Sequence, residues 1–136
     1  MSAKPAGSKP NIFPALKYKD GPAAIKWLQR AFGFREHVAY AAPDGGIAHA
    51  QMTLSGGMIM LGSAGKSDAK NPWTAERQGI YVCVDDIDAH YAAAKAAGAE
   101  IVRELANTDY GSREYSARDL DGHLWSFGTY QPWSNS

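Results

Sequence analysis

The segment Tyr115-Ser-Ala-Arg-Asp-Leu-Asp-Gly-His-Leu-Trp-Ser-Phe127 has the pattern of a β-hairpin. Its centre, Leu120-Asp-Gly122, contains turn-forming residues, and apolar and polar side chains alternate on either side of it. The pattern predicts strands at residues 113–119 and 123–130. In the second strand, Trp125 and Phe127 share one face, so we expect them in the core, with Ser126 on the opposite face.

A strand and a helix are predicted before this hairpin. Gly79–Val84 alternates between two faces, as a strand does, and Asp85-Asp86 is a typical N-cap for the helix that follows. Gly98 is placed to end that helix, and a further strand is expected at residues 99–105. The second half of the chain is therefore predicted to have the order βαβββ.

The first half of the chain repeats this order. A strand at residues 12–18 leads to a helix that is capped by Asp20 and ends at Gly33, and strands are expected at residues 36–41, 47–54 and 58–61. The two capping aspartates and the two terminal glycines are each separated by 65 residues (20 to 85 and 33 to 98). An internal duplication of a βαβββ unit explains this spacing.

The domain organisation follows from these two units. Residues 1–10, rich in Lys, Pro, Gly and Ser, are expected to form a flexible tail. One domain is expected over residues 11–131, made of modules at 11–62 and 78–131 that a linker at 63–77 joins. Trp73 in the linker and Trp133 near the end could act as lids or pack against a second subunit.

Taken together, these segments resemble the vicinal oxygen chelate superfamily, which includes glyoxalase I, extradiol dioxygenases, fosfomycin resistance enzymes and bleomycin-binding proteins. The hairpin is similar to the Asp-Pro-Asp-Gly hairpin of that family, with Leu120 in place of proline. Gly79-Ile-Tyr-Val-Cys-Val-Asp-Asp86, followed by a helix ending Ala96-Ala-Gly98, is the second similar piece. Ile47-Ala-His-Ala-Gln51 and Trp125-Ser-Phe-Gly-Thr-Tyr130 resemble the glyoxalase-like branch of uncharacterised members. The resemblance covers about residues 12–130.

The resemblance implies an α+β fold in which the two βαβββ modules form a curved mixed sheet around a cleft, with the helices on the outer face. Strand alternation then assigns side chains to the two faces. Ile80, Val82 and Val84 are expected to meet the helix, whereas Tyr81 and Cys83 are expected to face the cleft.

The superfamily's enzymes bind a divalent metal through His, Glu or Gln on the first, fourth, fifth and eighth strands. Carried over to this chain, those positions hold Phe13, Met60, Gly79 and Ser126. None of the four is a good ligand for a hard metal ion. The resemblance therefore implies no metal and no cofactor, and it argues against glyoxalase I and dioxygenase chemistry.

His49 and Arg118 are the candidate catalytic residues. His49 lies on the polar side of an alternating strand and could act as a general base or bind an acidic ligand, or simply line a wet cleft or a dimer contact. Arg118 could hold an anionic group, or form a structural ion pair with Glu114 on the same face. The other histidines are read as a surface residue (His37), a helix residue (His90) and a turn residue (His123).

Nine residues are expected to line a ligand-binding cleft, because each is predicted on a cleft-facing position: Phe13, His49, Gln51, Met60, Tyr81, Glu114, Ser116, Arg118 and Ser126. The apolar and aromatic members could instead close a small hydrophobic seam. Cys83 is expected to be a small buried side chain rather than a nucleophile, because no histidine is predicted beside it.

The composition argues against several other classes of protein. Lys and Arg together number 14, as do Asp and Glu, so no basic excess favours nucleic acid. The apolar runs are far shorter than the roughly 20 residues of a membrane span, and the first ten residues lack the apolar stretch of a signal peptide. The single cysteine, Cys83, fits a reducing cytoplasm.

Two classes of function remain. The first is a metal-free protein that binds a planar or aromatic small molecule, as bleomycin-resistance proteins do. The second is an enzyme of the same superfamily that uses His49 and Arg118, or a non-standard metal site. We favour the first, and we expect a homodimer, because the family forms its clefts within one chain or across two chains that exchange modules.

Overall fold

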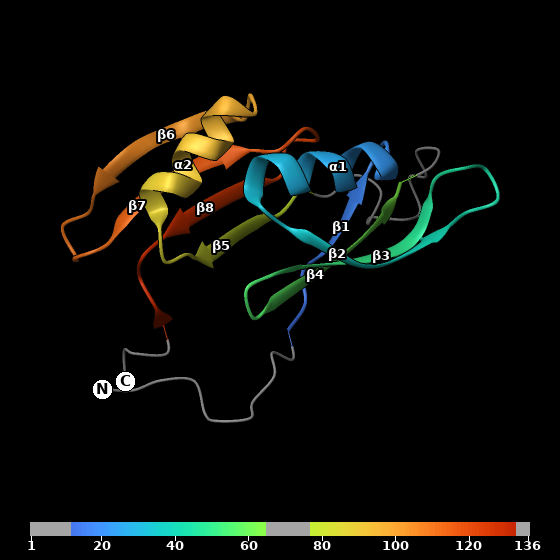
Figure 1. The fold of residues 1–136 in the computed structure, drawn as a ribbon, viewed down its shortest axis with the longest axis horizontal. Coiled ribbons are helices and arrows are strands. Elements are labelled where there is room, and N and C mark those ends of the chain that lie inside the picture. The colour runs from blue at the N-terminus through green and yellow to red at the C-terminus, as the bar shows by residue number, and fades with distance from the viewer. Residues whose placement is uncertain (1–11, 65–76, 133–136) are drawn as a thin grey trace.

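Two βαβββ units make up the computed structural model, which describes residues 12–64 and 77–132 (Figure 1). The first unit comprises β1 (Ala15–Tyr18), α1 (Gly21–Phe32), β2 (Arg35–Ala41), β3 (Ile47–Leu54) and β4 (Gly57–Ser63). The second comprises β5 (Gly79–Cys83), α2 (Ile87–Ala96), β6 (Glu100–Asn107), β7 (Arg113–Arg118) and β8 (Leu124–Gly128). The predicted α+β class and element order are confirmed. Trp73, Trp133, the predicted tail and most of the predicted linker lie outside the described residues.

Each unit forms one four-stranded sheet, and the two sheets have the same strand order. The orders are β1-β4-β3-β2 and β5-β8-β7-β6. In both sheets the first strand pairs in parallel with the last strand of its unit, and the other pairs are antiparallel. Figure 1 shows the sheets beside one another, with the helices α1 and α2 in contact. The repeated topology is what a duplicated unit requires.

Both helices begin and end where the sequence predicts. The Oδ1 of Asp20 accepts a hydrogen bond from the Ala23 amide at 3.0 Å, and α1 stops at Gly33, which has a φ of 80°. Asp86 caps α2 in the same way through the amide of Ala89, at 3.1 Å. A glycine is favoured after α1 because few other residues adopt a positive φ readily.

A single apolar core joins the two modules. Trp125 and Phe127, on β8, are fully buried as predicted. Their rings lie 5.4 Å and 4.8 Å from the ring of Phe32, at the end of α1. Since α1 belongs to the first module and β8 to the second, the first module does not bury its helix alone.

The Leu120-Asp-Gly122 turn also connects the modules, through the buried carboxylate of Asp119. Its Oδ2 accepts hydrogen bonds from the hydroxyl of Tyr18 at 2.6 Å and from the indole Nε1 of Trp125 at 3.0 Å. Its Oδ1 accepts the amide of His123 at 3.0 Å. Burial and the nearby carboxylate of Asp119 raise the pKa of Tyr18, so this phenol remains a hydrogen-bond donor.

His123 and His90 have larger structural roles than their sequence context indicated. The ring of His123 is fully buried: its Nδ1 accepts the amide of Gln78 at 3.1 Å, and its Nε2 donates to the carbonyl of Lys17 at 3.0 Å. His90, on α2, donates from Nε2 to the carbonyl of Phe32 at 2.8 Å. Both rings therefore bond across the modules.

Among residues 12–64 and 77–132, no helix is both long enough and apolar enough to span a membrane.

Candidate functional site

A groove of about 510 Å³ lies between the two modules. The first module contributes one wall, which includes Ile12, Pro14, Phe34, Leu54, residues 55–57, Met58 and Ile59. The second module contributes β5 from Ile80 to Cys83, together with Gln131. Because most of these side chains are apolar, the groove offers mainly dispersion and hydrophobic contacts to a ligand.

Tyr81 is the aromatic residue that β5 presents to this groove. Its side chain is 38% exposed, and its hydroxyl donates to the carbonyl of Tyr130 at 2.6 Å. Partial burial, with the nearby Cys83 and Glu114, raises the pKa of Tyr81 to about 12. The phenol therefore stays neutral at physiological pH and leaves the exposed part of its ring available for an aromatic ligand.

Cys83 lines the groove two residues further along β5. The structure leaves it partly exposed, so it is less buried than the sequence indicated. Its Sγ lies 3.8 Å from the carbonyl of Thr129 and 3.7 Å from the Nε2 of Gln131. Desolvation, followed by the nearby Asp85, raises the pKa of the thiol, which disfavours a nucleophilic thiolate.

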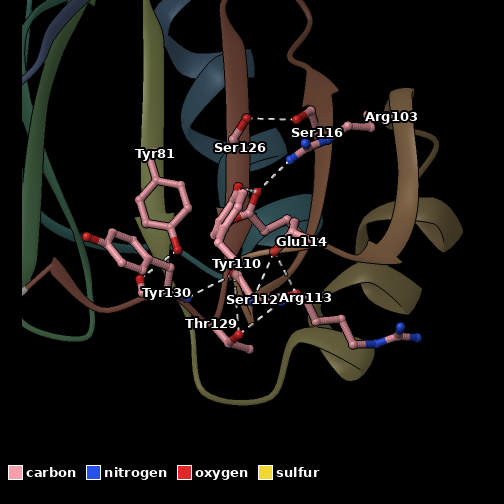
Figure 2. A network of polar contacts seen from close by, with 11 residues as sticks. Tyr81, Arg103, Tyr110, Ser112, Arg113, Glu114, Ser116, Ser126, Thr129 and Tyr130 are labelled. Carbon is pink, nitrogen blue, oxygen red and sulfur yellow. Dashed lines mark hydrogen bonds and ion pairs between the residues drawn. The ribbon is translucent and has the colours of Figure 1, made fainter. Parts of the chain in front are cut away.

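A polar cluster centred on Glu114 occupies the face of β7 and β8 that points away from the helices (Figure 2). Glu114 is only 5% exposed, and its Oε1 accepts Nη2 of Arg103 at 2.9 Å and the hydroxyl of Tyr110 at 2.8 Å. Burial disfavours the charged carboxylate, but hydrogen bonds from Tyr110, Arg103 and Ser112 outweigh it and lower the pKa of Glu114. The ion pair of Glu114 is therefore with Arg103; the predicted alternative of a pair with Arg118 is wrong.

Gly128 allows the groove and the polar cluster to meet. A Cβ atom added at this position would lie 2.5 Å from Cγ of Glu114, 2.9 Å from the hydroxyl oxygen of Tyr81 and 3.1 Å from Oε2 of Glu114. The missing side chain thus leaves space that Tyr81 and Glu114 both occupy. The carboxylate of Glu114 is consequently near the hydroxyl of Tyr81, a residue that lines the groove.

Ser116 and Ser126 form a second contact on this face. They are cross-strand partners on β7 and β8, and their Oγ atoms are 2.7 Å apart (Figure 2). On β5, the residue opposite Ser126 is Tyr81. The predicted residues Tyr81, Glu114, Ser116 and Ser126 are thereby all placed on the open face of the second sheet.

His49 and Gln51 lie on the open face of the first sheet. His49 Nε2 is 3.2 Å from Oε1 of Gln51, whose Nε2 is directed to the sulfur of Met58 at 3.3 Å. Gln51 therefore accepts from the His49 Nε2–H. On the other side, the ring of Tyr40 stacks on the His49 ring with centroids 6.4 Å apart.

The structure does not join the two candidate catalytic residues. His49 lies in the first sheet and Arg118 in the second, where the Nη1 of Arg118 donates to the carbonyl of Gly122 at 3.2 Å. Each makes these contacts within its own module. Phe13, which is 40% exposed, lies between two residues of the groove wall, and Met60 lies opposite Ala15 across β1 and β4.

Sequence analysis missed several residues of the polar cluster. Tyr110 and Ser112 belong to the loop before β7, Arg103 to β6, and Tyr130 follows β8. A loop has no periodicity that would assign its side chains to a face. The position of Arg103, on the strand paired with β7, is a signal that could have been used.

The donor set does not fit the divalent metal of the superfamily's enzymes. The four carried-over positions hold Phe13, Met60, Gly79 and Ser126, which together offer one hydroxyl and one thioether. Within the described part of the chain, no three His, Cys, Asp or Glu side chains gather as a metal site would require.

Comparison with known proteins gives consistent matches. A family model described as the Glyoxalase/Bleomycin resistance protein/Dioxygenase superfamily matches residues 14–127. The uncharacterized protein Mb0911c from Mycobacterium bovis is 31% identical over 126 residues, which cover 88% of this chain and 83% of that protein.

Two solved structures illustrate the structural similarity. TioX from Micromonospora sp. ML1 is 34% identical, with a TM-score of 0.74, and the match covers 92% of this chain and all of that one. A fosfomycin resistance protein, FosX, from Listeria monocytogenes, complexed with Mn(II) and 1S,2S-dihydroxypropylphosphonic acid, is 17% identical with a TM-score of 0.63. That match covers 95% of this chain and 96% of the other, and at this identity it shows a shared fold.

Proposed function

Since the chain belongs to the glyoxalase/bleomycin resistance protein/dioxygenase superfamily, we propose that it is a metal-free binding protein that sequesters an aromatic or planar small molecule in the groove between its modules.

The apolar groove is the observation that carries this proposal. Its volume of about 510 Å³ lies within the range of roughly 300–1,000 Å³ that is usual for small-molecule sites. Phe34, Met58 and Tyr81 supply two aromatic rings and a polarizable thioether to its lining. Such a lining favours a flat ligand that stacks over one that needs many hydrogen bonds.

Polar groups at one end of the groove would orient the ligand. Glu114 is held ionised by Arg103 and Tyr110, and it meets Tyr81 above Gly128. A ligand with a hydrogen-bond donor at one edge of its ring system would match this end. The mostly apolar wall and the single charged end together define the chemistry that we expect.

A thermal-shift screen of aromatic compounds, including antibiotics, in buffer with EDTA tests the proposal. We expect one or more compounds to raise the melting temperature of the chain, and Tyr81→Ala to abolish that rise. Tyr40→Ala is the matched control, because Tyr40 is 58% exposed and lies outside the residues that line the groove. Stabilisation that appears only after a divalent metal is added would contradict the proposal.

We also propose that the protein is a homodimer. The superfamily builds its clefts within one chain or between two chains, and duplicated modules make an exchange between chains simple. Light scattering at micromolar concentration should give twice the mass of one chain. A mass equal to that of one chain would contradict the homodimer.

A further inference from the structure

We propose that Lys17 and His49 form a subsite for a carboxylate group on the open face of the first sheet, centred over Gly62. This subsite lies outside the residues that line the groove, and the proposal does not rest on the proposed function.

Three neighbouring strands place these residues at one level. In the sheet, β4 lies between β1 and β3. Lys17 and Gly62 are partners across the parallel strands β1 and β4. On the other side of β4, Ala50 pairs with Leu61 in the antiparallel pair with β3, so the preceding residue, His49, lies opposite the following one, Gly62.

The same three residues share one face of the sheet. Ala50 and Leu61 are buried in the core. Side chains alternate along a strand, so Lys17 and His49 extend from the opposite face. At Gly62, which lies between them, no side chain fills the space.

The missing side chain produces a small pocket. A pocket of about 100 Å³ is lined by residues 15–17, Ala48, His49 and residues 60–62. Adjacent strands are about 4.8 Å apart, so the backbones of Lys17 and His49 are separated by roughly 10 Å, which leaves room for a carboxylate between the two side chains. A Cβ added at Gly62 would lie 3.2 Å from Nζ of Lys17, 3.2 Å from the carbonyl oxygen of Ala48 and 3.5 Å from that of Ile47. The ammonium group therefore leans over this position, and it is the positive charge beside two backbone carbonyl oxygens.

The charges of the pocket favour an anion. The two ion pairs among the described residues are Arg103 with Glu114 and Arg113 with Asp88. Within this part of the chain, therefore, no carboxylate pairs with Lys17. Gln51 and Tyr40 hold the His49 ring in place, so ordering it for a ligand costs little additional entropy. Because the Nε2–H is donated to Gln51, His49 donates to the carboxylate through Nδ1 when the ring carries its second proton, beside the ammonium group of Lys17.

A monocarboxylate matches this pocket better than a phosphate. One ammonium group balances one negative charge, whereas a phosphate group carries about 1.5 to 2 negative charges at neutral pH. The excess charge would lie against the apolar walls that Ala15 and Met60 provide, where charge is costly.

An NMR titration of the full chain with sodium benzoate, at constant ionic strength set with sodium chloride, tests the subsite. We expect saturable shifts of the backbone amide signals of Lys17, His49 and Gly62. Lys17→Met should weaken binding about tenfold or more, because a charge-assisted contact is lost. Lys26→Met, on the exposed side of α1, is the matched control and should leave binding unchanged.

A second variant and a second probe sharpen the test. His49→Phe keeps a ring against Tyr40 but removes the nitrogen atoms, and it should weaken benzoate binding as well. Inorganic phosphate should bind less tightly than benzoate; tighter phosphate binding would overturn the carboxylate assignment.

Three other results would overturn the subsite itself. They are shifts that do not saturate, equal weakening by Lys17→Met and Lys26→Met, and shifts centred on Tyr81 and Cys83, which would place benzoate in the groove. Tyr81→Ala should remove the groove ligand and leave benzoate binding at Lys17 intact, so failure of the subsite and failure of the proposed function are distinguishable.

Discussion

At the scale of single residues, the carboxylate of Asp119 holds the β7–β8 turn and connects it to the first module. It accepts hydrogen bonds from two buried side chains, Tyr18 and Trp125, and from two turn amides. No buried side-chain nitrogen or oxygen in the described residues lacks a partner. The removal of this carboxylate would therefore leave donors unsatisfied in the core.

We expect Asp119→Ala to lower the free energy of unfolding by roughly 2–5 kcal/mol, because each unsatisfied buried group costs about 1–3 kcal/mol. Urea denaturation followed by tryptophan fluorescence measures the change. Asp85→Ala, at an exposed position before α2, is the control and should change stability by less than about 0.5 kcal/mol. Equal effects of the two variants would contradict the role given to Asp119.

The sequence motif located this turn but could not show what it contacts. Tyr18 is 101 residues from Asp119, and Lys17 is 106 residues from His123. Alternation assigns a residue to a face of its own strand, and it carries no information about which distant side chain lies opposite. For this reason the sequence context of His123 predicts an ordinary turn residue, whereas its ring is fully buried.

At the scale of secondary-structure elements, strand alternation correctly assigned the core face of β8, whereas on β5 the groove is lined by Ile80 and Val82 as well as by Tyr81 and Cys83. On β8, Trp125 and Phe127 are fully buried, whereas on β5 Tyr81 is 38% exposed. The polar partners of Glu114 were harder to predict, because Tyr110 comes from a loop and Arg103 from a strand whose register with β7 is irregular. The core face of β8 was therefore predictable, and the contacts made from loops were not.

The two faces should respond differently to truncation. Phe127→Ala should cost about 3–5 kcal/mol of unfolding free energy, as the loss of a large core ring usually does. Tyr81→Ala should cost much less, because part of its ring is already exposed, and it should weaken ligand binding instead. Thermal or chemical denaturation of the two variants tests this, and a reversed order would mean that the strand register is off by one residue.

The contact between α1 and α2 should depend on pH through His90. Burial lowers the pKa of His90, although its hydrogen bond to Phe32 opposes this effect. The folded protein then binds fewer protons at this site than the unfolded chain, whose histidine has a pKa near 6.5. The contribution of His90 to stability should be complete above about pH 6.5 and should be lost as the pH falls below it.

Urea denaturation between pH 7.5 and pH 5 measures this dependence. We expect His90→Gln, which does not titrate, to lose less stability than the parent chain over this range. His37→Gln, at an exposed position on β2, should behave like the parent chain. If His90→Gln also behaves like the parent chain, another group causes the pH dependence.

At the scale of the whole molecule, the packing of two modules through one core creates the groove. Helix α1 packs its Phe32 against β8, and β5 then faces the β3–β4 hairpin across the groove. The family resemblance correctly predicted two modules and their topology. It could not predict that His49 and Arg118 would lie in separate sheets, with the contacts described for each confined to its own module. The way in which the two modules pack depends on core contacts between segments that are distant in the sequence.

The central claim is that the groove binds an aromatic ligand without a metal. Isothermal titration of the strongest compound from the thermal-shift screen into EDTA-treated protein tests it most directly. We expect saturable binding whose affinity is unchanged by one equivalent of Mn²⁺ or Zn²⁺, is lost in Tyr81→Ala and is retained in Tyr40→Ala. Binding that requires the added metal, or that is unaffected by Tyr81→Ala, would contradict it.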